Sequence, residues 1–163
     1  MKYTPIGVIH SPLKNPVGAP IQSVSAESVK GTVEVFPRFA GGLRDVAGFS
    51  NLILLYHFHM SRKFTLTVVP FLDDAEHGVF STRVPARPNP IGMSVVRVLS
   101  IRGRMIHVRC LDVIDRTPLL DIKPYVPSFD SMRADRVGWY AGHVEQPRLV
   151  FTKADGRFVK PSW

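Results

Sequence analysis

Prolines and glycines divide this chain into short segments, and that division limits the folds available to it. The 163 residues include 14 prolines and 12 glycines, which bound short alternating or β-branched apolar runs typical of strands. Helical periodicity is scarce, and neither an internal repeat nor a regular alternation of strands and helices is present. We therefore predict an all-β protein, a small barrel or sandwich with short helical insertions, and not a doubly wound parallel sheet.

At this length residues 1–163 suit a single domain with a sizeable core. The predicted strands are Pro5–His10, Gly31–Phe36, Asn51–His59, Phe64–Val69, Gly78–Thr82, Met93–Ile101 and Met105–Asp112. Asn51–His59 is almost continuously apolar, which is typical of a strand buried on both faces. Asp130–Tyr140 is the best helix candidate, and Arg148–Thr152 with Arg157–Val159 resembles a closing hairpin.

The formal net charge is +8. This excess favours a polyanionic partner such as a nucleic acid, although charge alone is also consistent with simple solubility. Cys110 is the only cysteine and lies in an apolar run, so we expect a buried structural thiol and no disulfide. No signal-like N-terminus is present, and no apolar run reaches the roughly 18 residues that a membrane helix needs. We therefore expect a cytoplasmic protein without a membrane partner.

Residues Ser81–Gly92, here called the strap, combine two arginines with three prolines. Proline fixes φ and favours an extended conformation in the residue before it, so the strap is stiff and holds Arg83, Arg87 and Asn89 outward. Such a segment is typical of the wall of a binding site. Alternatively, the prolines only stiffen the chain between neighbouring elements. Ser11–Ser28, here called the lid loop, has no repeating apolar face and indicates a lid over a ligand, or else a disordered excursion.

Carboxylates gather late in the chain, at Asp112, Asp115 and Asp121. Each of them alone is equally well explained as a turn cap, because aspartate is favoured in turns. Asp121 differs because it alternates with Lys123 and Tyr125, so these three side chains line one face of an extended segment. Ile122 between them is then expected to face the core, which places an acid, a base and an aromatic ring side by side.

His57 and His59 share one face if their strand is regular, so both imidazoles can approach one metal ion, as in a cupin-like enzyme. No third ligand lies at a convincing spacing, since His77 and the neighbouring aspartates fall in a predicted loop. We therefore predict no metal site, with one histidine packed and the other contacting a ligand. Glycine-rich nucleotide motifs and a Gly-x-Ser-x-Gly elbow are also absent.

Long motifs of this chain resemble those of the TrmO (TsaA-like) family. The strap contains Arg87-Pro88-Asn89-Pro90-Ile91-Gly92, and the acidic segment contains Thr117-Pro118 followed by Leu120-Asp121-Ile122-Lys123-Pro124-Tyr125. The matching segments elsewhere are Ile6–Pro12, Gly41–Leu43, Phe49-Ser50 and Phe58-His59. The resemblance implies a small β-barrel, unlike Rossmann methyltransferases, that works as a homodimer with S-adenosylmethionine bound near the subunit interface.

The implied substrate is tRNA, methylated on the exocyclic amine of a threonylcarbamoylated adenosine beside the anticodon. That amine is a poor nucleophile, so we predict that Asp121 and Tyr125 take or orient its proton and that Lys123 pairs with a phosphate or carboxylate. The cofactor contacts suggested by the resemblance are His59, Met60, Arg83, Arg87, Pro88, Asn89, Val98, Ile114, Asp115, Arg116 and Thr117. Cations expected at tRNA phosphates are Arg62, Lys63, Arg102, Arg104, Arg133 and Arg136.

Two departures from the family pattern stand out. Arg116 occupies the position where the family has a glycine, and the chain stops at Trp163, as in the short form without a C-terminal domain. Two rival functions remain, a non-catalytic RNA-binding barrel and, more weakly, a cupin-like metal enzyme. The strap and the aspartates argue against the first, because plain RNA binding needs no acidic pocket.

Overall fold

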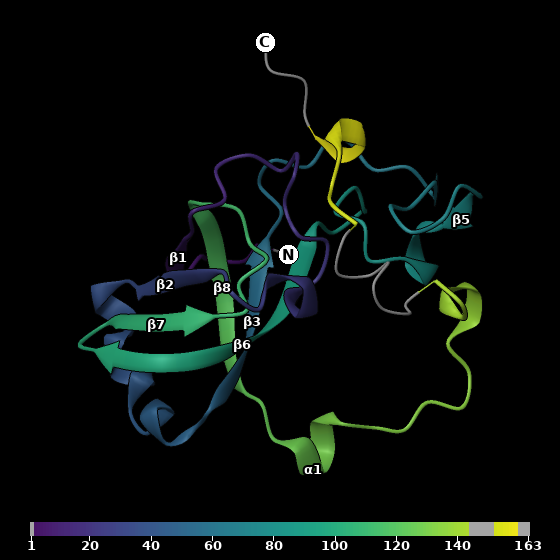
Figure 1. The fold of residues 1–163 in the computed structure, drawn as a ribbon. Coiled ribbons are helices and arrows are strands. Elements are labelled where there is room, and N and C mark those ends of the chain that lie inside the picture. The colour runs from purple at the N-terminus through teal and green to yellow at the C-terminus, as the bar shows by residue number, and fades with distance from the viewer. Residues whose placement is uncertain (1, 144–151, 160–163) are drawn as a thin grey trace.

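Six antiparallel strands close into a barrel in the order β1-β2-β7-β6-β3-β8 (Figure 1). The computed structural model describes residues 2–143 and 152–159. The barrel strands are β1 (Gly7–His10), β2 (Lys30–Val35), β3 (Asn51–His57), β6 (Ile91–Arg102), β7 (Met105–Arg109) and β8 (Thr117–Pro124). The predicted all-β barrel is therefore confirmed, as are the approximate positions of five of its strands.

Alternation along the strands places one set of side chains inside the barrel. In β3 the buried residues are Leu52, Leu54 and Tyr56, whereas the residues between them are only partly buried. The prediction that this strand is buried on both faces is therefore wrong, because no second layer covers the outside of β3 in the described part of the chain. The barrel core is completed by Ile9, Val33, Val96, Ile106, Val108, Leu111, Val113 and Leu119.

β8 is the barrel strand that the sequence did not reveal as a strand. Prolines stand near both of its ends, at Pro118 and Pro124, and they obscure the strand pattern. An irregularity in the pairing with β3 shifts the register between Leu119 and Asp121, so Ile122 packs against the barrel core as expected. Asp121 lies opposite Leu55 on the outer face.

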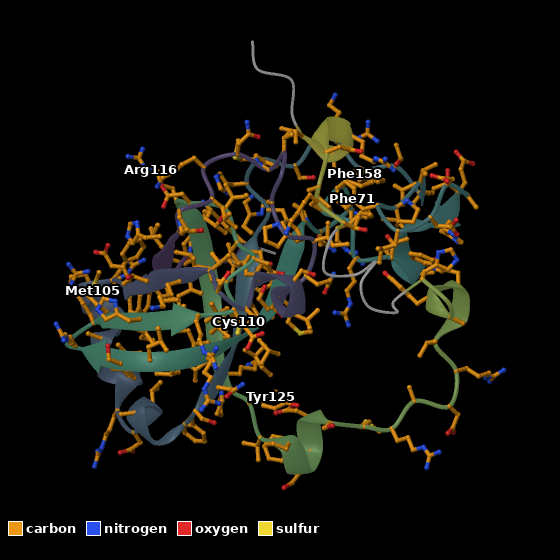
Figure 2. The ribbon with its side chains drawn as sticks, in the orientation of Figure 1. Phe71, Met105, Cys110, Arg116, Tyr125 and Phe158 are labelled. Carbon is orange, nitrogen blue, oxygen red and sulfur yellow. The ribbon has the colours of Figure 1, made fainter. Side chains whose placement is uncertain are left out.

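Residues 58–90, here called the outer segment, leave the barrel between β3 and β6. They contain a small two-stranded sheet of β4 (Thr67–Val68) and β5 (His77–Gly78), followed by η4 (Val79–Ser81). Phe71 of this segment meets Phe158 edge-to-face with centroids 5.1 Å apart (Figure 2). Together with Val68, Val79, Val84 and Ala86 they form a second apolar cluster. The predicted strands Phe64–Val69 and Gly78–Thr82 are thus mostly wrong.

The C-terminal part also differs from prediction. Asp130–Tyr140 is not a helix, since α1 covers only Pro127–Asp130 and η5 only Gly138–Tyr140. Side chains of residues 127–137 are all exposed, and a short helix without packing is unstable in water. Arg157–Val159 forms no hairpin strand because η6 spans Gly156–Phe158, and residues 148–151 of its expected partner lie outside the described part. The remaining short helices are η1 (Ser23–Ala26), η2 (Pro37–Leu43) and η3 (Val46–Gly48).

The connection between β7 and β8 contains two non-glycine residues with positive φ, Cys110 at 63° and Arg116 at 61°. The turn at Cys110 places Leu111 in the core, while the thiol itself is only partly buried, so the predicted buried thiol is wrong. Arg116 projects from the barrel surface (Figure 2). Among the described residues, no helix is long and apolar enough to cross a membrane.

Candidate functional site

A cavity of about 710 Å³ lies between the barrel and the outer segment. The barrel contributes Tyr56, Gly92 and Asp112 to its wall, and the outer segment contributes residues such as Phe71 and Leu72. The lid loop, η5 and the C-terminal turn with Asp155 and Phe158 also contribute to the lining. A cavity of this size, lined by aromatic and apolar side chains with a few polar groups, is typical of a small-molecule site.

Gly92 in β6 makes room for the aromatic part of this wall. A Cβ atom at Gly92 would overlap the ring of Tyr56 and crowd the ring of Phe58. Those two rings pack edge-to-face with their centroids 5.4 Å apart. The glycine of the strap motif is therefore required by close packing on the barrel side of the cavity.

A hydrogen-bonded chain of three side chains leads from the barrel core to the cavity. Ser94 Oγ donates to Asp112 Oδ1 at 2.5 Å, so its oxygen accepts from the Tyr56 hydroxyl at 2.9 Å. Burial raises the pKa of the Asp112 carboxyl to about 6, although the bond from Ser94 acts in the opposite direction. Burial likewise raises the pKa of Tyr56, so its hydroxyl stays protonated and can donate to Ser94. Asp112 therefore titrates near neutral pH within the cavity wall.

The strap lines another side of the cavity. Arg83 Nη1 donates to Gln22 Oε1 of the lid loop at 3.1 Å, which links the two segments across the cavity. Arg87 Nη1 donates to the main-chain oxygens of Thr82 at 3.0 Å and Val84 at 3.4 Å. One of the nitrogens of its guanidinium group therefore stabilises the conformation of the strap. Both guanidinium groups nevertheless belong to residues that line the cavity.

Residues 16 and 19–24 of the lid loop line the cavity of the same chain. Asp115 holds its base: Oδ1 accepts from Ser11 N at 2.9 Å and Oδ2 from Lys14 Nζ at 2.6 Å. The hydrogen bond from Lys14 is the largest of the effects that lower the pKa of Asp115. The carboxylate of Asp115 is thus engaged outside the cavity.

The structure brings together about half of the predicted cofactor residues. Those that line the cavity are His59, Met60, Arg83, Arg87, Ile114 and Thr117. Those that do not are Pro88, Asn89, Val98, Asp115 and Arg116. Val98 instead packs against the barrel core, and Pro88 and Asn89 are exposed. None of the predicted catalytic residues lines the cavity either.

Asp121, Lys123 and Tyr125 lie along the outside and the far end of β8. Lys123 Nζ is 2.8 Å from Asp121 Oδ2, so the predicted side-by-side arrangement of acid and base is present. Figure 2 shows Tyr125 at the opposite end of the barrel from Phe71 and Phe158. These residues therefore lie apart from the cavity within one chain.

Asp112, Tyr56 and Tyr140 are cavity residues that the sequence prediction did not include among site residues. The sequence gives one reason to suspect Asp112, since it is one of the three aspartates that gather late in the chain. Its importance, however, depends on its hydrogen bond with Ser94 of β6. Trp139 and Tyr140 were assigned to a helix that does not form. Their rings stack with centroids 3.9 Å apart beside the strap.

The two histidines of the possible metal pair separate. His57 lies opposite Ile91 on the outer side of the barrel, whereas His59 lines the cavity and its Nδ1 lies 3.3 Å from Thr117 Oγ1. Among residues 2–143 and 152–159, no three histidine, cysteine or acidic side chains lie close enough to hold a metal ion.

Comparisons with known proteins agree with the motifs. A family model described as the tRNA-methyltransferase O N-terminal domain matches residues 8–131. The chain is 51% identical over 156 residues to a probable S-adenosyl-L-methionine-binding protein of Pyrococcus abyssi, covering 96% of this chain and 84% of that protein. It is 35% identical over 141 residues to the tRNA (adenine(37)-N6)-methyltransferase of Escherichia coli, covering 80% of this chain and 60% of the enzyme.

A solved structure shares the fold. The crystal structure of TrmO from Pseudomonas aeruginosa matches with a TM-score of 0.71 at 34% identity, covering 85% of this chain and 62% of that one. The chain thus spans only about three-fifths of these two longer proteins. The matched domain nevertheless extends over most of the chain and includes both central motifs, so this protein belongs to the TrmO family.

Proposed function

We propose that this protein is an S-adenosylmethionine-dependent methyltransferase that acts on tRNA. The observation that carries the proposal is the cavity between barrel and strap, which combines aromatic walls, two arginines and a carboxylate that titrates near neutral pH. The names of the relatives support it, since they include S-adenosyl-L-methionine-binding proteins and tRNA (adenine(37)-N6)-methyltransferases. The net charge of +8 agrees with a tRNA substrate.

The residues of the cavity fit the chemistry of this cofactor. Its carboxylate would pair with Arg83 and Arg87, since arginine binds carboxylates through parallel hydrogen bonds. Its adenine would lie against the aromatic and apolar wall, which includes Phe71 and Leu72. When bound, S-adenosylmethionine supplies a methyl group already activated by attachment to a sulfonium sulfur. The protein's task is then to position the acceptor and accept its proton.

We assign to Asp112 the role of accepting the proton that the amine loses. It is a carboxylate in the cavity wall, and a base whose pKa lies near the working pH is well matched to proton transfer. With S-adenosylmethionine bound, its activated methyl group would be available to the amine nitrogen, and Asp112 would accept the proton that this nitrogen gives up. Ser94, held by Tyr56, keeps the carboxyl oriented.

The acceptor proposed is the exocyclic nitrogen of threonylcarbamoyladenosine at the position that adjoins the anticodon. The support is that the Escherichia coli and mouse relatives are named tRNA (adenine(37)-N6)-methyltransferases. Bases in single-stranded loops are the ones that proteins read in RNA, so an anticodon-loop base is a suitable target. A cytoplasmic location remains a prediction that accompanies this substrate.

A homodimer remains part of the proposal, and exposed apolar surface supports it. Ile91 and Met93 of β6 are exposed beside the cavity that they line. Residues 126–137, here called the arm, expose Phe129 by 68% and Met132 by 89%. A second copy that covers these surfaces would also meet Asp121 and Lys123, which remain candidates for a contact with the substrate of the partner. Sedimentation equilibrium measures the assembly: a strictly monomeric protein would contradict it.

Transfer of a labelled methyl group to tRNA tests the proposed function. Incubation of the protein with labelled S-adenosylmethionine and unfractionated tRNA should label an anticodon-loop adenosine, identified by nuclease digestion and mass spectrometry. The control is the same tRNA prepared from cells that lack threonylcarbamoylation. This tRNA should stay unlabelled. Label in both pools would contradict threonylcarbamoyladenosine as the required acceptor, but would leave methylation of tRNA standing. Cofactor binding without label in either pool would instead favour a non-catalytic RNA-binding protein or another acceptor.

A further inference from the structure

A second, smaller hollow of about 410 Å³ adjoins the cavity and has no role in the function proposed above. It lies where η4 of the outer segment meets η5 at the right of Figure 1. Arg83, Trp139 and Tyr140 line both spaces, whereas Phe80 and Arg136 line only the hollow. A ligand in the cavity and a ligand in the hollow would therefore be neighbours.

The wall between the two spaces is fixed in position. Trp139 Nε1 donates to the main-chain oxygen of Ser81 at 2.8 Å. Its ring stacks on His77 with centroids 4.4 Å apart and on Tyr140 at 3.9 Å. His77 Nε2 is in turn 2.9 Å from Asp73 Oδ2. A wall held by stacking and hydrogen bonds loses little entropy when a ligand binds.

Phe80 is the free aromatic surface of the hollow. Its neighbour Val79 is fully buried in the second apolar cluster, and the tight turn of η4 leaves the Phe80 side chain 77% exposed. An aromatic ring that stays exposed gains little hydrophobic free energy on folding, and contact with a ligand would bury it. Its position beside a fixed aromatic wall therefore points to stacking with a flat ligand.

The charged groups of the hollow are all cationic. Arg83 and Arg136 line it, and none of the described residues in its lining is acidic. Aromatic rings for bases combined with arginines for phosphates are the features that single-stranded RNA requires. A lining with two arginines and no carboxylate among its described residues favours an anionic ligand over a cationic one.

We infer that the hollow binds a nucleotide of single-stranded RNA that flanks the target base, with its base stacked on Phe80 and its phosphate beside Arg136. The inference rests on the proposed function for the identity of the target, which occupies the adjoining cavity. It adds a subsite that reads the neighbour of the modified nucleotide. Substrate choice would then depend on stacking of that neighbour as well as on the modified base.

Tryptophan fluorescence offers a direct probe, because the chain has 2 tryptophans. In a Trp163→Phe background, Trp139 is the only one left and reports on the shared wall. With the cofactor site saturated by S-adenosylhomocysteine, an anticodon stem-loop RNA should quench this emission. A blunt RNA duplex of the same length should not, and equal quenching by the duplex would overturn the single-strand assignment.

Substitutions at Phe80 then measure the stacking. Phe80→Ala should weaken the affinity for the stem-loop by roughly 5- to 150-fold, the range measured when one stacking aromatic is removed. Phe80→Tyr should keep the affinity, because the ring is retained. The control is Phe64→Ala, which removes an aromatic ring that is 52% exposed and lines neither space. Parent-like affinity in Phe80→Ala would overturn the inference.

The outcomes separate this inference from the proposed function. Calorimetric affinity for S-adenosylmethionine should be the same in Phe80→Ala and in the parent, because Phe80 does not line the cavity. If Phe80→Ala weakens RNA binding but no RNA is ever methylated, the subsite stands and the catalytic proposal fails. If Phe80→Ala methylates tRNA with an unchanged KM for tRNA, the catalytic proposal stands and the subsite fails. Arg136→Gln should lower the salt slope of RNA binding by about 0.7.

Discussion

Asp112 is the residue on which the proposed chemistry depends most, and its burial disfavours the ionised form of its carboxyl group. Its unperturbed pKa is 3.8, and burial raises that value to about 6 in the folded protein. The folded state therefore binds more protons than the unfolded state between those two values. The free energy of unfolding must consequently fall as pH rises from about 4 to about 6, and the lost stability amounts to about 3 kcal/mol above that window.

Asp112→Asn should therefore raise the free energy of unfolding at pH 7, by up to about 3 kcal/mol, because a neutral amide pays no cost for burial of charge. The amide oxygen can still accept the hydrogen bond from Ser94. Urea denaturation at pH 4 and pH 7 measures the effect, with the exposed Asp135→Asn as the control. Methyl transfer should be lost in the more stable variant. A destabilised Asp112→Asn would mean that the carboxylate serves structure and not catalysis.

Among the elements, the connection from β7 to β8 explains a departure from the family pattern. Arg116 adopts a φ of 61°, the left-handed region that glycine enters freely and other residues enter at a cost. The family glycine at this position is therefore explained by backbone conformation. It is not explained by approach to the cofactor, since Arg116 does not line the cavity.

Arg116→Gly should accordingly raise the free energy of unfolding by about 1 kcal/mol, because relief of left-handed strain outweighs the added freedom of the unfolded chain. Arg97→Gly is the matched control, since Arg97 is an exposed arginine inside β6 without positive φ. That change should lower stability by about 0.5–1 kcal/mol. Chemical denaturation of both variants decides the point, and a destabilised Arg116→Gly would show that the side chain has a stabilising contact.

Elements with a clear periodic pattern were predictable from the sequence, and elements fixed by tertiary contact were not. β3, β6 and β7 follow apolar alternation, whereas β8 is obscured by Pro118 and Pro124. In the site, the proline and arginine content of the strap is a local pattern and predicts a wall, and strap residues do line the cavity. The role of Asp112, in the connection between β7 and β8, depends on Ser94 of β6, which is 18 residues away, and no local pattern contains that contact.

At the scale of the whole molecule, two apolar clusters support one cavity. The barrel holds the larger cluster, the outer segment and Phe158 hold the smaller one, and residues from both line the cavity. Arg157 links the C-terminal turn to the outer segment through the main-chain oxygens of Val69 at 3.3 Å and Pro70 at 3.1 Å. The position of the site between two separately packed units explains why motifs far apart in sequence form one wall.

Isothermal titration calorimetry with S-adenosylmethionine tests the central claim that this cavity holds the cofactor. The parent protein should bind one cofactor per chain. Arg83→Ala should weaken that binding by roughly 10- to 150-fold, the cost of losing a hydrogen bond to a charged group. Arg102→Ala, at the β6–β7 hairpin outside the cavity, should bind like the parent. Absence of binding heat in the parent, or equal affinity in all three proteins, would contradict the account.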